Sequence, residues 1–342
     1  MSAPNVSVVR HGFATAKPLK TSNFKVIPNE PLPELQDGQV LTRTLYLSME
    51  PFLRFSFDEA PDAKSEGPIV GPGIGEIVKS KHPDYQVGEV VKGMTFPWSA
   101  YAVQTDPKGL RKIPARGKIP LSKFISALGL ASCTAWSSIK HRGNFKAGEI
   151  IYVSSAAGGV GQVVVQLAKR AGLKVIASAG TDAKVDYLSK QLKADYVFNY
   201  KKHDQRAELD KALAQLGSPS GFDIYYDTVQ GETLDIALEK VKPHGRIIAV
   251  GMMSTLGKKA DFYTYKNFGL VVRKHLDILG YTLFSHLEDA TEFLQTMIPL
   301  VESGQISVSE NIVEGIENAP KALIDMLDGQ YNGKVIVHVA DL

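Results

Sequence analysis

A strand-type run, a turn of small residues and a helix-type repeat follow one another between residues 149 and 172. The turn reads Ala-Ala-Gly-Gly-Val-Gly over residues 156–161, and apolar residues then recur at helical spacing until Gly172 ends the helix. Gly158 lets the backbone approach a pyrophosphate, and Gly161 lets the helix pack close to the strand. The helix N-terminus adds free N–H groups and a positive dipole end. This pattern predicts a dinucleotide site, and a plain strand-to-helix turn is the alternative interpretation.

The residues expected to contact the cofactor are those of this turn and of the helix start. They are Ala157, Gly158, Gly159, Val160 and Gly161.

The residues at the end of the next strand-type run indicate whether the cofactor is NAD or NADP. Residues 174–179 form this run, at whose end an NAD site usually carries an Asp or Glu for the ribose 2′-hydroxyl. Here small neutral residues occupy the position, and Thr181 or Asp182 is expected to cap the following helix. Lys184, one turn later, suits the 2′-phosphate of NADP, although an ordinary solvated charge is the alternative. We therefore expect NADPH as the cofactor.

The composition limits the possible classes of protein. The chain has 342 residues, with 44% hydrophobic and 22% charged residues, which is typical of a globular protein with more than one domain. A net charge of +3, without a dense Lys/Arg run interleaved with aromatics, argues against a nucleic-acid partner. No apolar run approaches the ~18–20 residues of a membrane span, and the N-terminus lacks an apolar signal core. We expect no membrane contact and a cytoplasmic location.

Cysteine and histidine usage bears on metals. The single cysteine, Cys133, excludes an internal disulfide and a multi-thiolate zinc site, and its small, apolar neighbours favour a packed core thiol over a nucleophile. The eight histidines show no metal-ligand spacing along the chain. The sequence therefore predicts no metal site.

The pattern of secondary structure expected from the sequence changes once along the chain. Short β-type runs broken by Gly and Pro fill residues 6–120, and strand-type and helix-type segments alternate from about residue 122. The predicted fold class is α/β, with a small β-barrel-like domain over residues 1–121 and 305–342 and a doubly wound parallel sheet over residues 122–304. The expected strands of that sheet are 150–153, 175–179, 196–199, 224–227, 246–250 and 276–279.

Motifs in order along nearly the whole chain resemble the zinc-independent medium-chain dehydrogenases/reductases, specifically the prostaglandin reductase and alkenal double-bond reductase group. Besides the cofactor turn, the matching segments are LSMEPFLR (47–54), GIGEIV (73–78), GEVV (88–91), GTDAK (180–184), FNY (198–200), GFDIYYD (221–227) and GQYNGK (329–334).

This resemblance implies a GroES-like β-barrel domain joined to a Rossmann domain, and a metal-free reaction. The reaction is hydride transfer from NADPH to the β-carbon of an α,β-unsaturated ketone or aldehyde. The resulting enolate is thought to receive hydrogen bonds from the nicotinamide ribose 2′-hydroxyl and a tyrosine. The expected cofactor contacts also include Gly180, Thr181, Lys184, Tyr200, Val250, Gly251 and Asn332. The Asn of the group's C-terminal Gly-x-Asn motif aligns with Tyr331, and Asn332 follows one position later.

The chain departs from the group at the expected catalytic positions. Phe52 replaces the tyrosine of the first motif, Glu50 replaces its Asp, and Leu256-Gly257 stands where the group often has Tyr-Asn. The remaining candidates for the hydroxyl donor are Tyr263, Tyr265 and Tyr281, for each of which a packing or surface role is the stronger alternative. Arg54 either meets an acidic substrate group or braces the barrel.

Two other functions remain open at this stage, and both retain the NADPH site. One is a quinone reductase, and the other is a non-catalytic NADPH-binding structural or sensor protein. A homodimer is also expected, because residues 276–279 form a strand that, at the sheet edge, would expose unpaired backbone groups. The resemblance points to the same assembly.

Overall fold

A computed structural model describes residues 5–61, 63–113, 119–257 and 262–342. The chain folds as two compact units, which consist of Met1–Leu130 with Glu310–Leu342 (unit 1) and of Ala131–Ser309 (unit 2). The sequence predicts the corresponding boundaries at residues 121/122 and 304/305. Within the described part of the chain, no helix combines the length and the apolar character needed to cross a bilayer.

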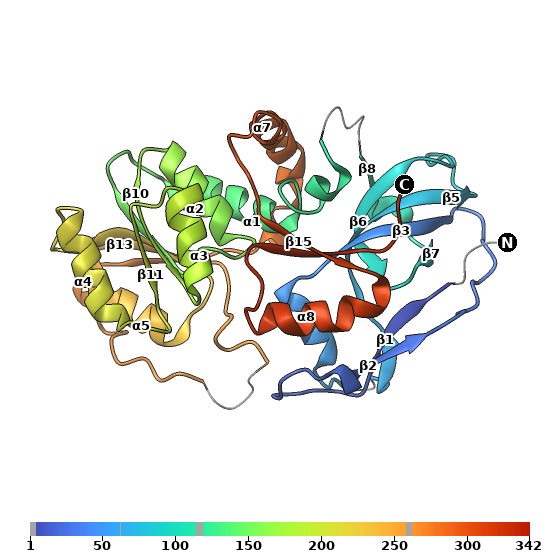
Figure 1. The fold of residues 1–342 in the computed structure, drawn as a ribbon, viewed down its shortest axis with the longest axis horizontal. Coiled ribbons are helices and arrows are strands. Elements are labelled where there is room, and N and C mark those ends of the chain that lie inside the picture. Colours follow the sequence, from blue (N-terminus) through green and yellow to red (C-terminus); the bar gives the residue numbers. More distant parts are fainter. Residues whose placement is uncertain (1–4, 62, 114–118, 258–261) are drawn as a thin grey trace. The chain divides into compact units, whose positions relative to one another are not determined.

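Unit 1 is built from β-sheets. Its strands are β1 (Ser7–His11), β2 (Phe24–Ile27), β3 (Val40–Ser48), β4 (Glu66–Pro68), β5 (Val70–Ser80), β6 (Val90–Pro97), β7 (Tyr101–Gln104), β8 (Arg111–Lys112), β15 (Glu310–Glu314) and β16 (Lys334–His338). One sheet has the order β2-β1-β4, and the other has the order β15-β16-β3-β5-β6-β8, with β7 paired to β3. β15 and β3 thus share a sheet although they come from opposite ends of the chain (Figure 1).

The core of unit 1 lies between these sheets and helix α8 (Ala319–Leu327). The Phe24 ring lies 4.8 Å from the Phe57 ring and 6.2 Å from the Trp98 ring, measured between centroids. Helix α8 turns its buried Ala319, Ala322 and Leu323 toward this cluster, at the i, i+3, i+4 spacing of one helix face. The C-terminal segment therefore completes the core that the N-terminal strands begin.

Unit 2 contains a parallel sheet. Its strands are β9 (Ile150–Val153), β10 (Lys174–Ala179), β11 (Tyr196–Asn199), β12 (Phe222–Asp227), β13 (Val241–Ala249) and β14 (Asp277–Gly280), in the order β11-β10-β9-β12-β13-β14. All of its pairings are parallel. The six strand predictions and the α/β fold class are therefore confirmed. From β9 to β11 successive strands are added on one side of β9, and from β12 to β14 they are added on the other side. An open α/β sheet binds its ligand at this point of reversal in strand order, between β9 and β12.

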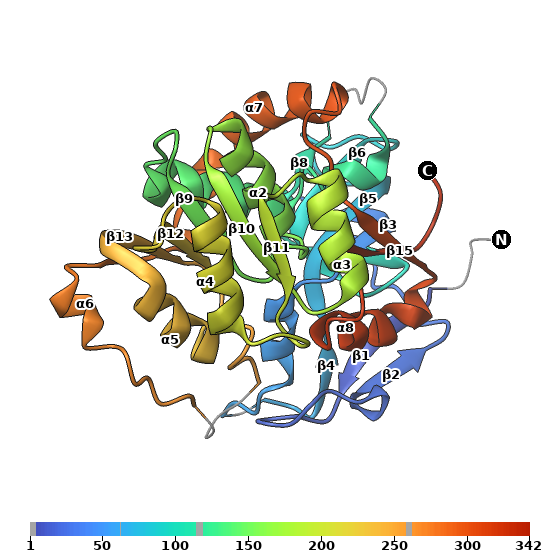
Figure 2. The ribbon, with the colours of Figure 1, turned by 60° about the vertical axis from the view of Figure 1, so that its left-hand side comes forward.

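Helices flank this sheet, and aromatic residues fill the space beneath them. The helices from residue 130 to residue 302 are α1 (Leu130–Ser138), α2 (Gly161–Arg170), α3 (Asp182–Asp186), α4 (Gln205–Gln215), α5 (Gly231–Lys240), α6 (Leu270–Arg273) and α7 (Ala290–Glu302). Figure 2 shows α2 and α4 beside β9, β10 and β11. The buried Tyr152 ring stacks on the Tyr225 ring with centroids 5.1 Å apart and on the Phe198 ring at 6.2 Å. These stacked rings form part of the hydrophobic core of unit 2.

Candidate functional site

The glycine turn after β9 has the close packing that its sequence predicts. A Cβ atom on Gly161 would lie 2.6 Å from the Ser155 carbonyl oxygen and 2.7 Å from the Ala156 Cα, both of which are backbone atoms. A Cβ on Gly158 would lie 3.2 Å from the same Ser155 oxygen. The Ala156 N–H donates to the Ser178 carbonyl at 3.0 Å, which ties the turn to β10. Only glycine fits at Gly161 without moving the backbone.

The start of α2 fits a phosphate group. The residue at its N-cap, Val160, has no side-chain capping bond. The N–H groups of Gln162 and Val163 already donate to the carbonyls of Gly158 and Val160 at 3.1 Å, so the feature that suits pyrophosphate oxygens here is the positive end of the helix dipole. The turn and helix start therefore fit a dinucleotide by their own geometry. Contacts of Ala157, Gly158, Gly159, Val160 and Gly161 with the cofactor stay predictions.

The carboxyl end of β10 offers no free acid. Thr181 caps α3, and its hydroxyl accepts the Lys184 N–H at 3.3 Å. The Asp182 carboxylate accepts from the Asn199 side chain at 2.8 Å and from the Lys202 ammonium at 2.5 Å. Asp182 is thus engaged by its neighbours, and the end of β10 lacks the carboxylate that would favour NAD.

Two lysines and a tyrosine gather at this strand end instead. A Cβ on Gly180 would lie 3.1 Å from the Tyr200 hydroxyl oxygen and 3.2 Å from the Lys201 Cε. Burial, and then the positive charge of Lys201, lower the pKa of Lys184. Two cations held near each other at the end of β10 favour an anion at this position. Sequence reasoning missed Lys201, although it directly follows the predicted Tyr200.

A buried polar network joins the two strands at the reversal point of the sheet. The Tyr225 hydroxyl donates to Asp227 Oδ1 at 2.9 Å, and its oxygen lies 3.1 Å from the Ser154 hydroxyl oxygen. Asp227 Oδ1 also accepts the backbone N–H groups of Val229 and Gln230, both at 2.8 Å. Burial raises the pKa of Asp227 despite these hydrogen bonds. The network was not predicted, because Ser154 and Asp227 lie far apart in the sequence.

Asp227 also positions the segment that follows β13. Its backbone carbonyl accepts the N–H groups of Val250 at 2.8 Å and of Gly251 at 3.2 Å. A Cβ on Gly251 would lie 2.9 Å from the Thr228 carbonyl oxygen. Val250 and Gly251 are therefore fixed next to the reversal point, where the sequence predicts that they bind the cofactor.

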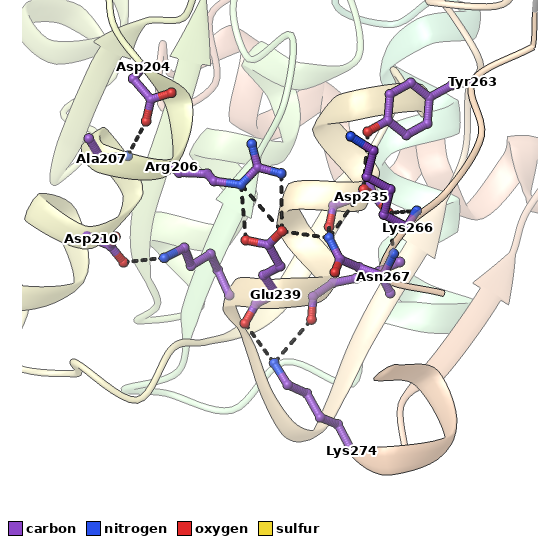
Figure 3. Close-up of polar contacts among 12 residues, drawn as sticks. Asp204, Arg206, Ala207, Asp210, Asp235, Glu239, Tyr263, Lys266, Asn267 and Lys274 are labelled. Carbon is purple, nitrogen blue, oxygen red and sulfur yellow. Dashed lines mark hydrogen bonds and ion pairs between the residues drawn. The ribbon is translucent and has the colours of Figure 1, made fainter. Parts of the chain in front are cut away.

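The catalytic candidates Tyr263 and Tyr265 are both bonded to α5. The Tyr263 hydroxyl donates to Asp235 Oδ2 at 3.1 Å, beside the Asn267 amide that holds the same carboxylate (Figure 3). The Tyr265 hydroxyl accepts the Gly231 N–H at 3.1 Å. These contacts hold the segment after residue 261 against α5, so both hydroxyls have a structural partner within unit 2.

Around this segment, polar contacts tie α4, α5 and α6 together. The Arg206 guanidinium pairs with Glu239 at 3.1 Å, and the Asn267 amide donates to the same carboxylate at 2.6 Å (Figure 3). The Lys274 ammonium donates to the Leu238 and Glu239 carbonyls at the end of α5. Cations at a helix C-terminus stabilise its unpaired carbonyls. The segment carrying the two tyrosines is thus anchored at both ends.

The third candidate, Tyr281, follows β14 directly. It is buried, its ring stacks on that of His286 with centroids 5.3 Å apart, and burial raises its pKa to about 12. A packing role accounts for these contacts, and a catalytic role stays a prediction.

In unit 1, Arg54 is buried and bonded to the backbone. Its guanidinium donates to the Ala14 carbonyl at 2.5 Å and to the Lys17 carbonyl at 2.9 Å, and it pairs with Asp58 at 3.1 Å. These bonds occupy both terminal nitrogens of the guanidinium. They support the bracing alternative, and the contact with a substrate stays a prediction.

A buried ion pair near Arg54 was missed by sequence reasoning. The Lys334 ammonium lies 2.7 Å from Glu50 Oε1 and 2.6 Å from the Met49 carbonyl, and the Ser48 hydroxyl donates to the same Glu50 oxygen at 2.7 Å. This pair fixes the 47–54 motif to the start of β16. Asn332, two residues before Lys334, accepts the Asn311 side-chain N–H on its backbone carbonyl at 2.6 Å.

Known proteins share both units of this chain. Residues 15–113 match the family described as the N-terminal domain of oxidoreductase, and residues 159–303 match the family described as zinc-binding dehydrogenase. The NADP-dependent 2-alkenal reductase of Nicotiana tabacum is 32% identical over 343 residues, which is 98% of each chain. Prostaglandin reductase 1 of Rattus norvegicus is 34% identical over 319 residues, covering 92% of this chain and 94% of the relative.

A solved structure is also similar along the full length. The structure of CurA in complex with NADPH from Vibrio vulnificus has a TM-score of 0.88 and 25% identity, and the match covers 98% of this chain and 100% of that one. The fold and the glycine turn define a nucleotide-binding oxidoreductase of two domains. The chain belongs to the medium-chain dehydrogenase/reductase family, in its zinc-independent alkenal and prostaglandin reductase branch.

Proposed function

We propose that this protein uses NADPH to reduce the carbon–carbon double bond of an α,β-unsaturated ketone or aldehyde, leaving the carbonyl intact. The observation that carries the cofactor choice is the end of β10, where Lys184 and Lys201 stand in place of a free carboxylate. The reaction is supported by the relatives named 2-alkenal reductase and prostaglandin reductase.

Different residues are proposed to bind different parts of the cofactor. The N–H groups around Gly158 to Gly161 hold the pyrophosphate, and Lys184, Lys201 and Tyr200 hold the 2′-phosphate. Gly180, Thr181, Val250, Gly251 and Asn332 complete the proposed cofactor contacts. When bound, NADPH supplies a hydride to the β-carbon of the substrate.

Charge then develops on the carbonyl oxygen of the substrate, and a hydroxyl donor at that oxygen lowers the barrier. The proposed protein donor is one of Tyr263, Tyr265 and Tyr281. If Tyr263 or Tyr265 donates, its change to Phe should lower kcat by less than the ~10²–10³-fold typical of an oxyanion donor, because a ribose hydroxyl would remain. If the hydroxyl only anchors its segment to α5, the same change should lower the melting temperature and leave kcat unaltered.

Product analysis tests the reaction itself. An enone and an enal incubated with the enzyme and NADPH should yield the saturated ketone and aldehyde. An allylic alcohol as the main product would overturn the proposal. Faster turnover of quinones than of enones would assign the protein as a quinone reductase. Tight NADPH binding without turnover of any of these compounds would assign a non-catalytic binding protein.

The proposed assembly is a homodimer formed through unit 2. β14 is an edge strand of the parallel sheet, and Ile278 on it is exposed, as is Val272 on α6. Such an edge offers unpaired backbone groups to a second strand. Light scattering at micromolar concentration should give the mass of two chains, and the mass of one chain would contradict the proposal. We place the protein in the cytoplasm, which cell fractionation would test.

A further inference from the structure

Three potential metal ligands that are scattered in the sequence come together in unit 2. His141, His286 and Asp289 each offer one ligand atom, and these atoms lie within 4.8 Å of one another. His141 Nε2 lies 2.8 Å from Asp289 Oδ2. The two imidazole rings stack with centroids 4.1 Å apart. Two imidazoles and one carboxylate form a ligand set that Zn²⁺ and similar ions take in proteins.

The carboxylate of this group is held in place by a second layer of contacts. The Asp289 side chain is 4% exposed, and its Oδ1 accepts from the Lys140 ammonium at 2.8 Å. The Ser137 hydroxyl donates to Oδ2. The Tyr281 ring stacks on His286 with centroids 5.3 Å apart. Outer contacts of this kind orient ligands before an ion arrives.

The charges around the group favour a divalent cation. Lys140 pairs with Asp289 and, at 2.6 Å, with Glu292, while His286 Nδ1 lies 3.6 Å from Glu288. Two carboxylates pair with the Lys140 ammonium and a third lies beside His286, so these groups together carry two negative charges when the imidazoles are neutral. Two imidazolium rings stacked face to face would repel each other. One doubly charged ion balances the group.

We propose that His141, His286 and Asp289 bind one divalent transition-metal ion, with Zn²⁺ as the expected species, at a site separate from the cofactor turn. A tetrahedral ion with ligands at roughly 2.1 Å keeps them about 3.4 Å apart. The ligand atoms must therefore close inward, and the two imidazole rings, now stacked 22° from parallel, must turn until the ion lies in the plane of each ring. A water molecule would take the fourth position. The ion joins the segment after α1 to the segment before α7, so its role is to stabilise unit 2.

Direct binding of Zn²⁺ tests this site. The full chain, freed of metal by a chelator and dialysed, should bind one Zn²⁺ per chain in a calorimetric titration and melt at a higher temperature with the ion. Co²⁺ should give the visible absorption bands of a tetrahedral site. His286→Ala or His141→Ala should weaken Zn²⁺ binding by at least about a hundredfold. Ser137→Ala, which removes a hydrogen bond to the Asp289 ligand, should weaken it by about tenfold.

His244 provides the matched control. Its ring stacks on that of His275 with centroids 5.4 Å apart, but the described part of the chain places neither residue in a group of three ligands. His244→Ala should leave Zn²⁺ binding unchanged, and all variants should retain NADPH binding as a check on folding. The proposal is overturned if the wild-type chain binds no Zn²⁺, or if the His286→Ala and Ser137→Ala variants bind it as tightly as the wild type.

Discussion

Lys201 lies close enough to Lys184, at the carboxyl end of β10, for its positive charge to add to burial in lowering the pKa of Lys184. Two like charges near each other raise the energy of the free protein. An anion bound beside them offsets this repulsion, because it accepts charge-assisted hydrogen bonds from the ammonium groups. The pair therefore favours a ligand with a phosphate at this point over one with a hydroxyl.

Lys184→Ala and Lys201→Ala should each raise the KM for NADPH much more than the KM for NADH. A charge-assisted phosphate contact contributes ~1.5–3 kcal/mol, which corresponds to roughly a ten- to hundredfold change in binding. Steady-state kinetics with both cofactors measures this difference. Lys190→Ala is the control, because Lys190 is exposed and pairs with Asp186 at 2.9 Å. A wild-type enzyme that prefers NADH would refute the cofactor assignment.

Gly161→Ala should disrupt the cofactor turn. The new methyl group would lie 2.6 Å from the Ser155 carbonyl oxygen, and the neighbouring atoms are backbone, so the turn itself must move. Overpacking of this kind costs ~1–3 kcal/mol of stability, and we expect NADPH binding to fall at least tenfold. Gly269→Ala is a matched control, because a Cβ there has nothing within 4 Å. Equal NADPH affinity in both variants would show that the turn does not form the site.

Local pattern was enough to predict the strands of unit 2 and the glycine turn, because hydrophobic spacing and small residues act over a few positions. The Asp227–Tyr225–Ser154 network could not be predicted in this way, since β9 and β12 become neighbours only in the folded sheet. The same holds for His141, whose partners lie more than a hundred residues later. Residues that meet through long-range topology leave no periodic signal in one sequence.

Removing metal ions should leave the rate of double-bond reduction unchanged. The chain belongs to a zinc-independent branch, and its single cysteine is buried. A metal bound by His141, His286 and Asp289 would raise the melting temperature but would take no part in the reaction. Turnover should therefore be equal before and after exhaustive chelation, measured below the melting temperature of the metal-free protein. Lost activity that Zn²⁺ restores at that temperature would contradict this prediction.

The stability of the folded chain should depend on pH through Asp227. Burial raises the pKa of Asp227, so over the interval between its unfolded and folded pKa values the folded chain binds more protons than the unfolded chain. The contribution of Asp227 to the free energy of unfolding must then increase as the pH falls toward about 4, the usual pKa of an aspartate. Asp227→Asn keeps the shape and an acceptor oxygen but does not titrate.

Urea unfolding of both proteins over a pH series measures this effect. The wild-type chain should gain stability relative to Asp227→Asn as the pH is lowered from 7 to about 4. Tyr225→Phe should widen this pH interval, because the Tyr225 hydroxyl bond lowers the pKa of Asp227 and its loss lets burial act more strongly. Parallel stability curves for the wild type and Asp227→Asn would show that the carboxyl group titrates alike in the folded and unfolded chains.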